Sequence, residues 1–275
     1  MGSRMRLGLA QMDMVHRDKA GNLAACRQMI GQAAEEKVDL LLFPELTLTG
    51  FSSHIAEDGE ALDHSQTLDF FSREAAAHHM AMGFGMIVSP SAQAEKGENH
   101  CVLLGREGQL LADYAKVHPF SFGAEGRFYT GGTGWTSCQL DDFTIAPFVC
   151  YDLRFPEIFR VRCRQVQLMT VIANWPSTRM EHWYLLLRAR ALENQCYVAG
   201  VNRWGQEGKL SYTGGSTVVA PDGTILVQDE NGPGLVTCDI DRETVDKTRK
   251  ALPFLPDRRP EVYAHLFAQE ADEQA

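Results

Sequence analysis

Four residues that could act together in catalysis stand in three separated segments of the chain. Glu45 follows the apolar run VDLLLFP, Lys116 ends LLADYAK, and Cys150 ends TIAPFVC. Glu125 lies a short distance after Lys116, in the loop sequence VHPFSFGAEGRFYTGG. Residues at strand ends can meet at one edge of a sheet although they are far apart in sequence, and loops at that edge build active sites. The sequence therefore predicts that these four side chains share one site.

The chemistry of such a site is nucleophilic catalysis by a thiol. A thiol becomes a strong nucleophile as the thiolate, and a carboxylate within hydrogen-bond reach could take its proton. The Lys116 ammonium would lower the pKa of the Cys150 thiol and stabilise an oxyanion. A second carboxylate could hold the lysine or position a water. Backbone N–H groups at the predicted helix start after Cys150 would suit an oxyanion hole.

Hydrophobic patterning places these residues on alternating strands and helices. Apolar runs predict buried strands over residues 6–12, 38–43, 81–89, 168–173, 197–202 and 234–240. Helical spacing predicts helices over residues 19–37, 66–80, 156–164, 180–195 and 241–251, and turn signals predict hairpins over 100–116, 135–150 and 216–228. Residues 45–64 are expected to form a loop. The two halves echo each other weakly, since LLLFPE and TVIANWP each end a buried strand in proline. The pattern predicts one α/β domain of mixed sheets with helices outside.

Three motifs in order, LLLFPE, YAKVHPF and FVCYDLRFPE, resemble the signatures of the nitrilase superfamily of carbon–nitrogen hydrolases. The segments IANWPSTRMEHW and LRARALENQCYVAGVNRWG resemble most closely those of bacterial ω-amidases. The resemblance implies an αββα sandwich of two mixed sheets flanked by helices, with a single domain over residues 5–265 and a frayed tail over 266–275. It also implies a Glu-Lys-Cys triad of Glu45, Lys116 and Cys150, with Glu125 matching the frequent second glutamate.

The activity that the resemblance implies is amide hydrolysis. An ω-amidase hydrolyses the terminal amide of a small 2-oxo dicarboxylate monoamide, 2-oxoglutaramate or 2-oxosuccinamate, to acid and ammonia through a cysteine thioester. Glu45 would move the protons, and Lys116 with the backbone N–H of Tyr151 would stabilise the oxyanion. No metal or organic cofactor is needed. The family also implies a homodimer or larger homo-oligomer, and the tail PFLPDRRPEVYAHLF could cross to a neighbour.

Alternative functions remain open. The same triad would serve an N-carbamoyl amidohydrolase or a deaminated-glutathione amidase. A non-catalytic binding or regulatory protein could keep the same fold. A protease-like site of Cys150, His118 and Asp152 is a further alternative, but it would leave Glu45 and Lys116 unexplained.

Two further residues are candidates for substrate binding. Arg154 could bind a substrate carboxylate bidentately, although pairing with Asp152 or Glu157, which would hold the turn after Cys150, is the favoured interpretation. Trp175, just after a predicted strand, is expected to line the pocket. No H-E-x-x-H or similar ligand spacing predicts a metal site.

Composition restricts the class of protein further. The 275 residues carry a net charge of −10, which argues against nucleic acid as the main partner because phosphate binding needs a basic face. No apolar run is long enough to span a bilayer, and no signal peptide is recognised. The seven cysteines are widely spaced and form no C-x-x-C motif, so we expect free thiols, a cytoplasmic location and no membrane partner. The first four residues could be a cloning remnant, which would make Met5 the natural start.

Overall fold

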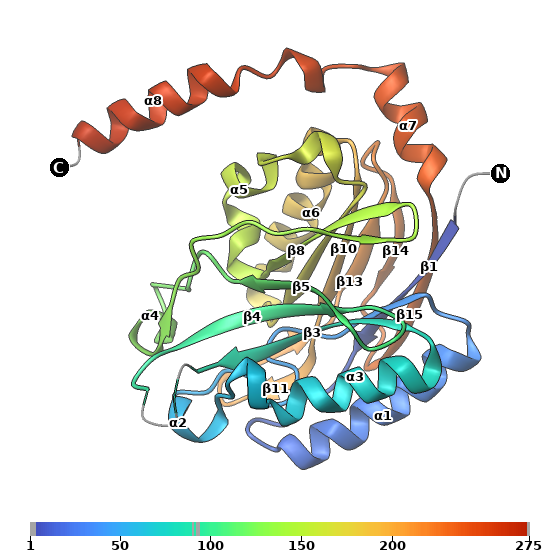
Figure 1. The fold of residues 1–275 in the computed structure, drawn as a ribbon, viewed down its shortest axis with the longest axis vertical. Helices are drawn as coiled ribbons and strands as arrows, with labels where there is room; N and C mark the ends of the chain where they lie inside the picture. Colours follow the sequence, from blue (N-terminus) through green and yellow to red (C-terminus); the bar gives the residue numbers. More distant parts are fainter. Residues whose placement is uncertain (1–3, 90, 92–93, 274–275) are drawn as a thin grey trace.

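Two mixed β-sheets pack face to face, and helices cover the outer face of each sheet (Figure 1). The structure is a computed structural model and describes residues 4–89, 91 and 94–273. Helices α1 (Lys19–Glu35) and α3 (Gln66–His78) contact the first sheet, and helix α6 (Met180–Asn194) contacts the second. The predicted αββα sandwich of two mixed sheets is therefore confirmed.

The first sheet has the strand order β15-β1-β2-β3-β4-β5, and β6 pairs with β4. Strands β1, β2 and β3 are parallel to one another, and antiparallel strands flank them on both sides. The strands of this sheet are β1 (Arg4–Gln11), β2 (Leu40–Leu42), β3 (Ala81–Val88), β4 (Gly97–Leu104), β5 (Leu110–Ala115), β6 (Tyr129–Thr130) and β15 (Gly234–Asp241).

The second sheet repeats this plan with the order β14-β13-β10-β9-β8-β7. Strands β8, β9 and β10 are its parallel set, and antiparallel strands again flank them. The strands of this sheet are β7 (Cys138–Leu140), β8 (Phe143–Val149), β9 (Leu168–Ala173), β10 (Tyr197–Asn202), β13 (Ser216–Val219) and β14 (Ile225–Asp229).

The weak sequence echo between the two halves reflects this repeated plan. Strand β2 is the middle strand of the first parallel set and leads into FPE, residues 43–45. Strand β9 is the middle strand of the second set and leads into NWP, residues 174–176. All residues of β9 and β10 are buried, as expected for parallel strands covered on both faces.

The remaining helices are short or lie near the C-terminus. They are α2 (Ile55–Asp58), α4 (Glu125–Phe128), α5 (Pro156–Arg160), α7 (Arg242–Ala251) and α8 (Pro260–Glu273), with 3₁₀ turns η1 (Leu62–His64), η2 (Cys150–Arg154), η3 (Cys163–Gln165), η4 (Ser177–Arg179) and η5 (Leu255–Asp257). In the part of the chain that the structure describes, no helix is long and apolar enough to cross a bilayer.

Two of the predicted elements need correction. The predicted loop over residues 45–64 contains helix α2 and turn η1. The predicted helix over residues 156–164 ends at Arg160, because Val161 is extended and Arg162 adopts a left-handed φ of 48°. Phe159 in the helix and Cys163 in the following turn η3 are both buried, so the segment buries its apolar side chains without a longer helix.

Several elements were not predicted at all, among them α4 and β6 in the segment that was expected to be a loop. Strands β11 (Trp204–Glu207) and β12 (Leu210–Thr213) form a separate two-stranded sheet. Helix α8 continues to Glu273, so it includes most of the segment that was expected to be a frayed tail. Pro260 suits its first position because that position needs no backbone donor. Residues 1–3 and 274–275 lie outside the described residues.

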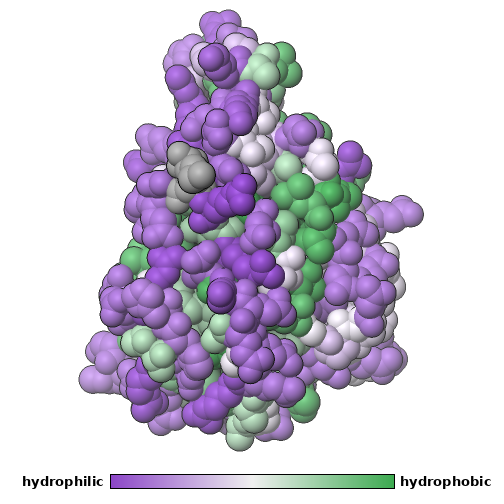
Figure 2. All heavy atoms as spheres, turned by 90° about the vertical axis from the view of Figure 1, so that its right-hand side faces the viewer, coloured by the Kyte–Doolittle hydropathy of each residue, from purple (hydrophilic) through white to green (hydrophobic). Residues whose placement is uncertain are grey.

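Apolar side chains remain exposed at several places on the surface. Helix α8 has no buried residue and runs along the outside of the molecule (Figure 1). Figure 2 shows a mostly hydrophilic face on which hydrophobic residues gather in one larger patch. Exposed apolar side chains include Leu192 of α6 and Ile225 and Leu226 of β14.

Candidate active site

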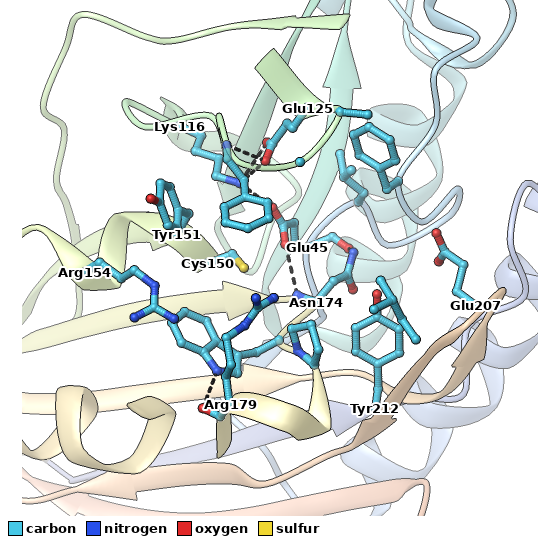
Figure 3. A pocket seen from close by; sticks show the side chains of 18 residues that line it. Glu45, Lys116, Glu125, Cys150, Tyr151, Arg154, Asn174, Arg179, Glu207 and Tyr212 are labelled. Atoms are coloured by element: carbon cyan, nitrogen blue, oxygen red, sulfur yellow. Dashed lines mark hydrogen bonds and ion pairs between the residues drawn. The ribbon is translucent and has the colours of Figure 1, made fainter. Parts of the chain in front are cut away.

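The four residues singled out in the sequence lie together at one end of the sandwich (Figure 3). Glu45 follows β2, Lys116 follows β5, Glu125 begins α4, and Cys150 follows β8. The first three come from connections of one sheet, and Cys150 comes from the other. Lys116 Nζ lies 2.9 Å from Glu45 Oε1 and 2.8 Å from Glu125 Oε1. Strand ends of both sheets therefore build one cluster.

Hydrogen bonds fix the Glu45 carboxylate on both of its oxygens. Oε1 accepts from Lys116 Nζ and, at 2.7 Å, from the side-chain amide of Asn99. Oε2 accepts from the backbone N–H of Asn174 at 2.9 Å, and the Asn174 side chain donates to the Glu45 carbonyl at 3.1 Å. The segments FPE after β2 and NWP after β9, which occupy equivalent places in the two sheets, therefore contact each other at Glu45.

A glycine on the neighbouring strand makes room for the Glu45 backbone. A β-carbon on Gly85 would lie 2.3 Å from the backbone nitrogen of Leu46 and 2.9 Å from Glu45 Cα. The Thr47 backbone N–H donates to the Gly85 carbonyl at 2.9 Å, and the Gly85 N–H donates to the Thr47 hydroxyl oxygen at 3.0 Å. Strand β3 therefore holds Glu45 in place through close backbone contact.

Lys116 is a buried cation between two carboxylates. Burial alone would lower its pKa, but Glu45 and Glu125 raise that pKa well above the ordinary value. Glu125 Oε2 lies 3.0 Å from Lys116 Nζ and also accepts from the backbone N–H of Phe120 at 2.8 Å. The lysine therefore stays an ammonium, and it presents a fixed positive charge beside Cys150 (Figure 3).

Cys150 stands in a strained conformation at the start of a turn. Its φ of 43° lies in the left-handed region, which costs a non-glycine residue about 1–3 kcal/mol. Cys150 begins the 3₁₀ turn η2, and helix α5 then starts at Pro156, as predicted. Such outliers persist where the surroundings hold them, and they gather at functional sites.

The Cys150 thiol has a raised pKa, which corrects one expectation. Desolvation raises this pKa well above the ordinary value and the Glu45 carboxylate adds to the rise. Lys116 does act to lower it, but its effect is outweighed. The resting group is therefore a thiol, and a base must take its proton before it can attack.

The cluster opens into a cavity of about 230 Å³ whose walls combine apolar and aromatic side chains with charged ones. A cavity of this size suits a small molecule rather than a polymer. Its apolar and aromatic lining comes from both sheets, from the loop before α4 and from the β11–β12 hairpin. These lining residues are Leu46, Phe51, Phe120, Tyr151, Trp175, Pro176, Leu210 and Tyr212.

Two arginines line this cavity, and neither has a carboxylate partner among the described residues. The Arg154 guanidinium lies 4.7 Å from the ring centroid of Trp175 and 3.3 Å from Nδ1 of His182. The favoured pairing of Arg154 with an acidic neighbour was thus wrong, because the side chain turns into the pocket instead (Figure 3). The Arg179 guanidinium lies 5.5 Å from the ring centroid of Phe120. Both are cations held on aromatic faces.

Sequence reasoning missed several lining residues. Arg179 stands in the segment IANWPSTRMEHW, several residues after the end of β9, and nothing in this segment indicated that its side chain lines the cavity. The lining residues Asn174 and Tyr212 were also missed, although NWP marked a strand end as FPE did, and so was Asn99, which does not line the cavity but donates to Glu45. Trp175 lines the pocket as predicted, and its indole N–H donates to the Arg179 carbonyl at 2.8 Å.

His118 is engaged away from the cluster. Its Nδ1 lies 2.9 Å from Asp152 Oδ1, and its ring stacks on Phe155 with centroids 3.8 Å apart. His118 is not among the residues that line the cavity, so the arrangement does not favour a Cys-His site. Over the described ranges, no group of three or more His, Cys, Asp or Glu side chains is placed to hold a metal ion.

Comparison with known proteins gives a consistent result. Residues 6–250 match the family described as carbon-nitrogen hydrolase. The chain is 33% identical over 224 residues to omega-amidase YafV from Escherichia coli K12, which covers 81% of this chain and 84% of that protein. It is 32% identical over 237 residues to a 2-oxoglutaramate amidase from Paenarthrobacter nicotinovorans, which covers 83% and 81% of the two chains. A CN-hydrolase superfamily protein from Xanthomonas campestris superposes with a TM-score of 0.85 at 31% identity, covering 94% of this chain and 98% of the other.

Proposed function

The chain belongs to the carbon-nitrogen hydrolase family, and we propose that it hydrolyses the terminal amide of a small 2-oxo dicarboxylate monoamide. The proposed substrates are 2-oxoglutaramate and 2-oxosuccinamate. The products would be the 2-oxo dicarboxylate and ammonia. Relatives named as omega-amidase and 2-oxoglutaramate amidase support this substrate class.

The observation that carries the proposal is the pair of pocket arginines, Arg154 and Arg179, which have no carboxylate partner among the described residues. Such a substrate has a reacting amide at one end and a carboxylate at the other. Glu45, Lys116 and Cys150 would meet the amide, while Arg154 and Arg179 would meet the carboxylate. A guanidinium can bind a carboxylate through two parallel hydrogen bonds, and it does so best where water is excluded.

In the first half of the reaction Glu45 acts as base and then as acid. It takes the proton of the Cys150 thiol, and the thiolate attacks the amide carbon. The tetrahedral oxyanion that forms is stabilised by the Lys116 ammonium and by the backbone N–H of Tyr151. The protonated Glu45 then gives its proton to the amide nitrogen. The C–N bond breaks, ammonia leaves, and a thioester on Cys150 remains.

In the second half a water replaces the ammonia. Glu45, again a carboxylate, takes a proton from this water, whose oxygen attacks the thioester carbon. The second tetrahedral intermediate uses the same oxyanion donors. Breakage of the C–S bond releases the acid, and the sulfur recovers its proton from Glu45. Glu125 would act through Lys116, because it holds the ammonium in place with both carboxylate oxygens.

The test is ammonia release from 2-oxoglutaramate by the wild type and by Cys150→Ala. We expect release by the wild type alone. Cys238→Ala is the matched control, since Cys238 is the other partly exposed cysteine and lies on β15 outside the pocket. Mass spectrometry of the wild type during turnover should show the acyl adduct on Cys150.

The same assay separates the alternatives. Release from an N-carbamoyl amino acid or from deaminated glutathione, with none from 2-oxoglutaramate, would reject the proposed substrate and keep the nucleophile. If the folded protein binds these amides but releases ammonia from none of them, the result would favour a non-catalytic role.

A further inference from the structure

A fully buried carboxylate that the proposed mechanism does not use lies two residues after Cys150. Asp152 has none of its surface exposed. A buried carboxylate without partners would cost several kcal/mol, so such a group survives only with hydrogen-bond donors around it. Asp152 therefore has to be explained by what it holds.

Four donors surround this carboxylate. Oδ2 accepts from the Tyr114 hydroxyl at 2.8 Å and from the Val149 backbone N–H at 3.2 Å. Oδ1 accepts from the backbone N–H of His118 at 3.0 Å and, in the tautomer with the proton on Nδ1, from its ring at 2.9 Å. We name Asp152 with Tyr114, Val149 and His118 the Asp152 clasp.

The donors come from the two segments that carry the reacting groups. Tyr114 precedes Lys116 by two positions and His118 follows it by two. Val149 directly precedes Cys150. Lys116 follows β5 of the first sheet, whereas Cys150 follows β8 of the second. One carboxylate thus ties together two chain segments that belong to different sheets.

The clasp also stabilises the strained turn at Cys150. The bond from the Val149 N–H to Asp152 closes over Cys150, whose φ is 43°. The His118 ring stacks on Phe155, the residue just after turn η2, and the Phe155 N–H donates to the Asp152 carbonyl at 2.9 Å. Both ends of the turn are therefore fastened to the segment of Lys116.

We propose that Asp152 is a positioning residue, which sets the placement of Lys116 relative to Cys150 by holding Tyr114 and His118 against the turn. This inference rests on the roles of Lys116 and Cys150 in the proposed function. Reacting groups must lie within about 0.5 Å of their productive geometry, so a loosened link between the sheets lowers turnover before it unfolds the protein.

The test compares four variants with the wild type. Asp152→Asn keeps the shape but removes the charge, and Tyr114→Phe removes one donor. His118→Leu removes the ring donor, whereas His118→Asn keeps an amide N–H that can replace Nδ1. Tyr197→Phe is the matched control, because Tyr197 is a buried strand tyrosine whose hydroxyl bonds to the Asp241 carbonyl at 3.2 Å, outside the pocket.

Two readouts distinguish positioning from general destabilisation. For Asp152→Asn we expect kcat to fall about 10- to 100-fold with little change in KM, since small misplacements of reacting groups cost that much. Alkylation of Cys150 by iodoacetamide, followed by mass spectrometry, needs no amide substrate. Because Lys116 lowers the pKa of this thiol, a displaced Lys116 should slow alkylation near pH 7 about three- to tenfold and move its pH midpoint upward.

The variants are expected to form a graded series. Tyr114→Phe and His118→Leu should lower kcat and slow alkylation in the same direction as Asp152→Asn, but by less. His118→Asn should recover most of the activity that His118→Leu loses. Tyr197→Phe should change neither kcat nor alkylation. Folded Asp152→Asn and Tyr114→Phe proteins with wild-type kcat and alkylation profiles would overturn the inference. If Asp152→Asn shifts alkylation while the wild type hydrolyses no amide, the clasp stands and the proposed function fails.

Discussion

The Lys116 ammonium lies 2.9 Å from Glu45 Oε1, although 71 positions separate the two residues in the sequence. This bond joins the end of β5 to the end of β2 in a buried place beside Cys150. Its consequence is electrostatic, because Glu45 both neutralises Lys116 and raises the pKa of the thiol that it is proposed to deprotonate. The two effects of Glu45 can be separated by substitution.

Glu45→Gln should abolish most of the hydrolysis while making the Cys150 thiol more acidic. Loss of a general base costs about 10²- to 10⁴-fold in kcat. The Glu45 carboxylate raises the thiol pKa through its charge, so its removal lowers that pKa and moves the alkylation midpoint to lower pH. Ammonia release and iodoacetamide alkylation, both followed across pH, measure the two effects.

The control for this variant is Lys116→Met, which should move the thiol pKa the other way. Removal of the ammonium takes away the one effect that lowers it. A Glu45→Gln protein whose alkylation midpoint moves upward, or stays in place, would contradict this account of the site.

Arg154→Met and Arg179→Met should reduce activity on anionic amides and spare neutral ones. A hydrogen bond to a charged group contributes about 1.5–3 kcal/mol, which is about 10- to 100-fold in kcat/KM. The measurement is kcat/KM for 2-oxoglutaramate and for pentanamide, a neutral amide of the same chain length. The Arg179 carbonyl that holds Trp175 stays in place in the variant, since only the side chain changes.

The two pocket arginines need a control for the loss of a positive charge. Arg188→Met provides it, because Arg188 is exposed on α6 and does not line the cavity. An equal loss on both amides would mean that the arginines support the pocket walls rather than bind a carboxylate. The proposed substrate class would then lose its main support.

The sequence predicted the sheets and the central residues because their signals are local. Apolar runs ending in Glu45 and Cys150 mark buried strands, and strand ends of one edge meet in space. The partners of these residues could not be predicted in the same way. Asn99 lies in the middle of β4 and Arg179 in a 3₁₀ turn, so their roles depend on how two sheets pack. The orientation of the Arg154 side chain likewise depends on Trp175, which follows β9 and provides the ring on which the guanidinium lies.

Helix α8 is expected to pack against a second copy of the chain. It is a 14-residue helix without a buried residue, and helices of about 12–15 residues are marginal in water on their own. Tyr263 and Phe267 line a groove together with Arg160 and Arg162, and the acidic end of a partner's α8 would find complementary charge in these arginines. We expect a dimer by sedimentation equilibrium, and a monomer after removal of residues 260–275.

A point variant tests the same surface without truncation. Phe267→Glu should weaken the dimer, whereas Leu110→Glu, an equally exposed apolar residue on β5, should not. A wild-type chain that sediments as a monomer at micromolar concentration would contradict the docking of α8.

His100 should make stability depend on pH in a definite direction. This buried residue of β4 has its ring 2.6 Å from Asp113 of β5 and 3.3 Å from Glu98. Burial alone would lower its pKa, but these two carboxylates raise it above the ordinary 6.5. A raised folded pKa means that the charged ring stabilises the fold fully below pH 6.5, and that this stabilisation is lost as pH rises through the folded value.

The difference in Tm between the wild type and His100→Gln should therefore be largest near pH 6 and shrink as the pH increases. A charge-assisted bond of this kind contributes about 1.5–3 kcal/mol, so the difference at pH 6 should be several degrees. His64→Gln is the control, because His64 and its partner Asp63 are both exposed and their pair contributes little. A difference that grows with pH would show that the ring is neutral in the folded protein. The neighbouring Asn99 carbonyl accepts the Lys116 N–H at 2.8 Å, so loosening this strand pair should lower amidase activity at a pH where the fold still persists.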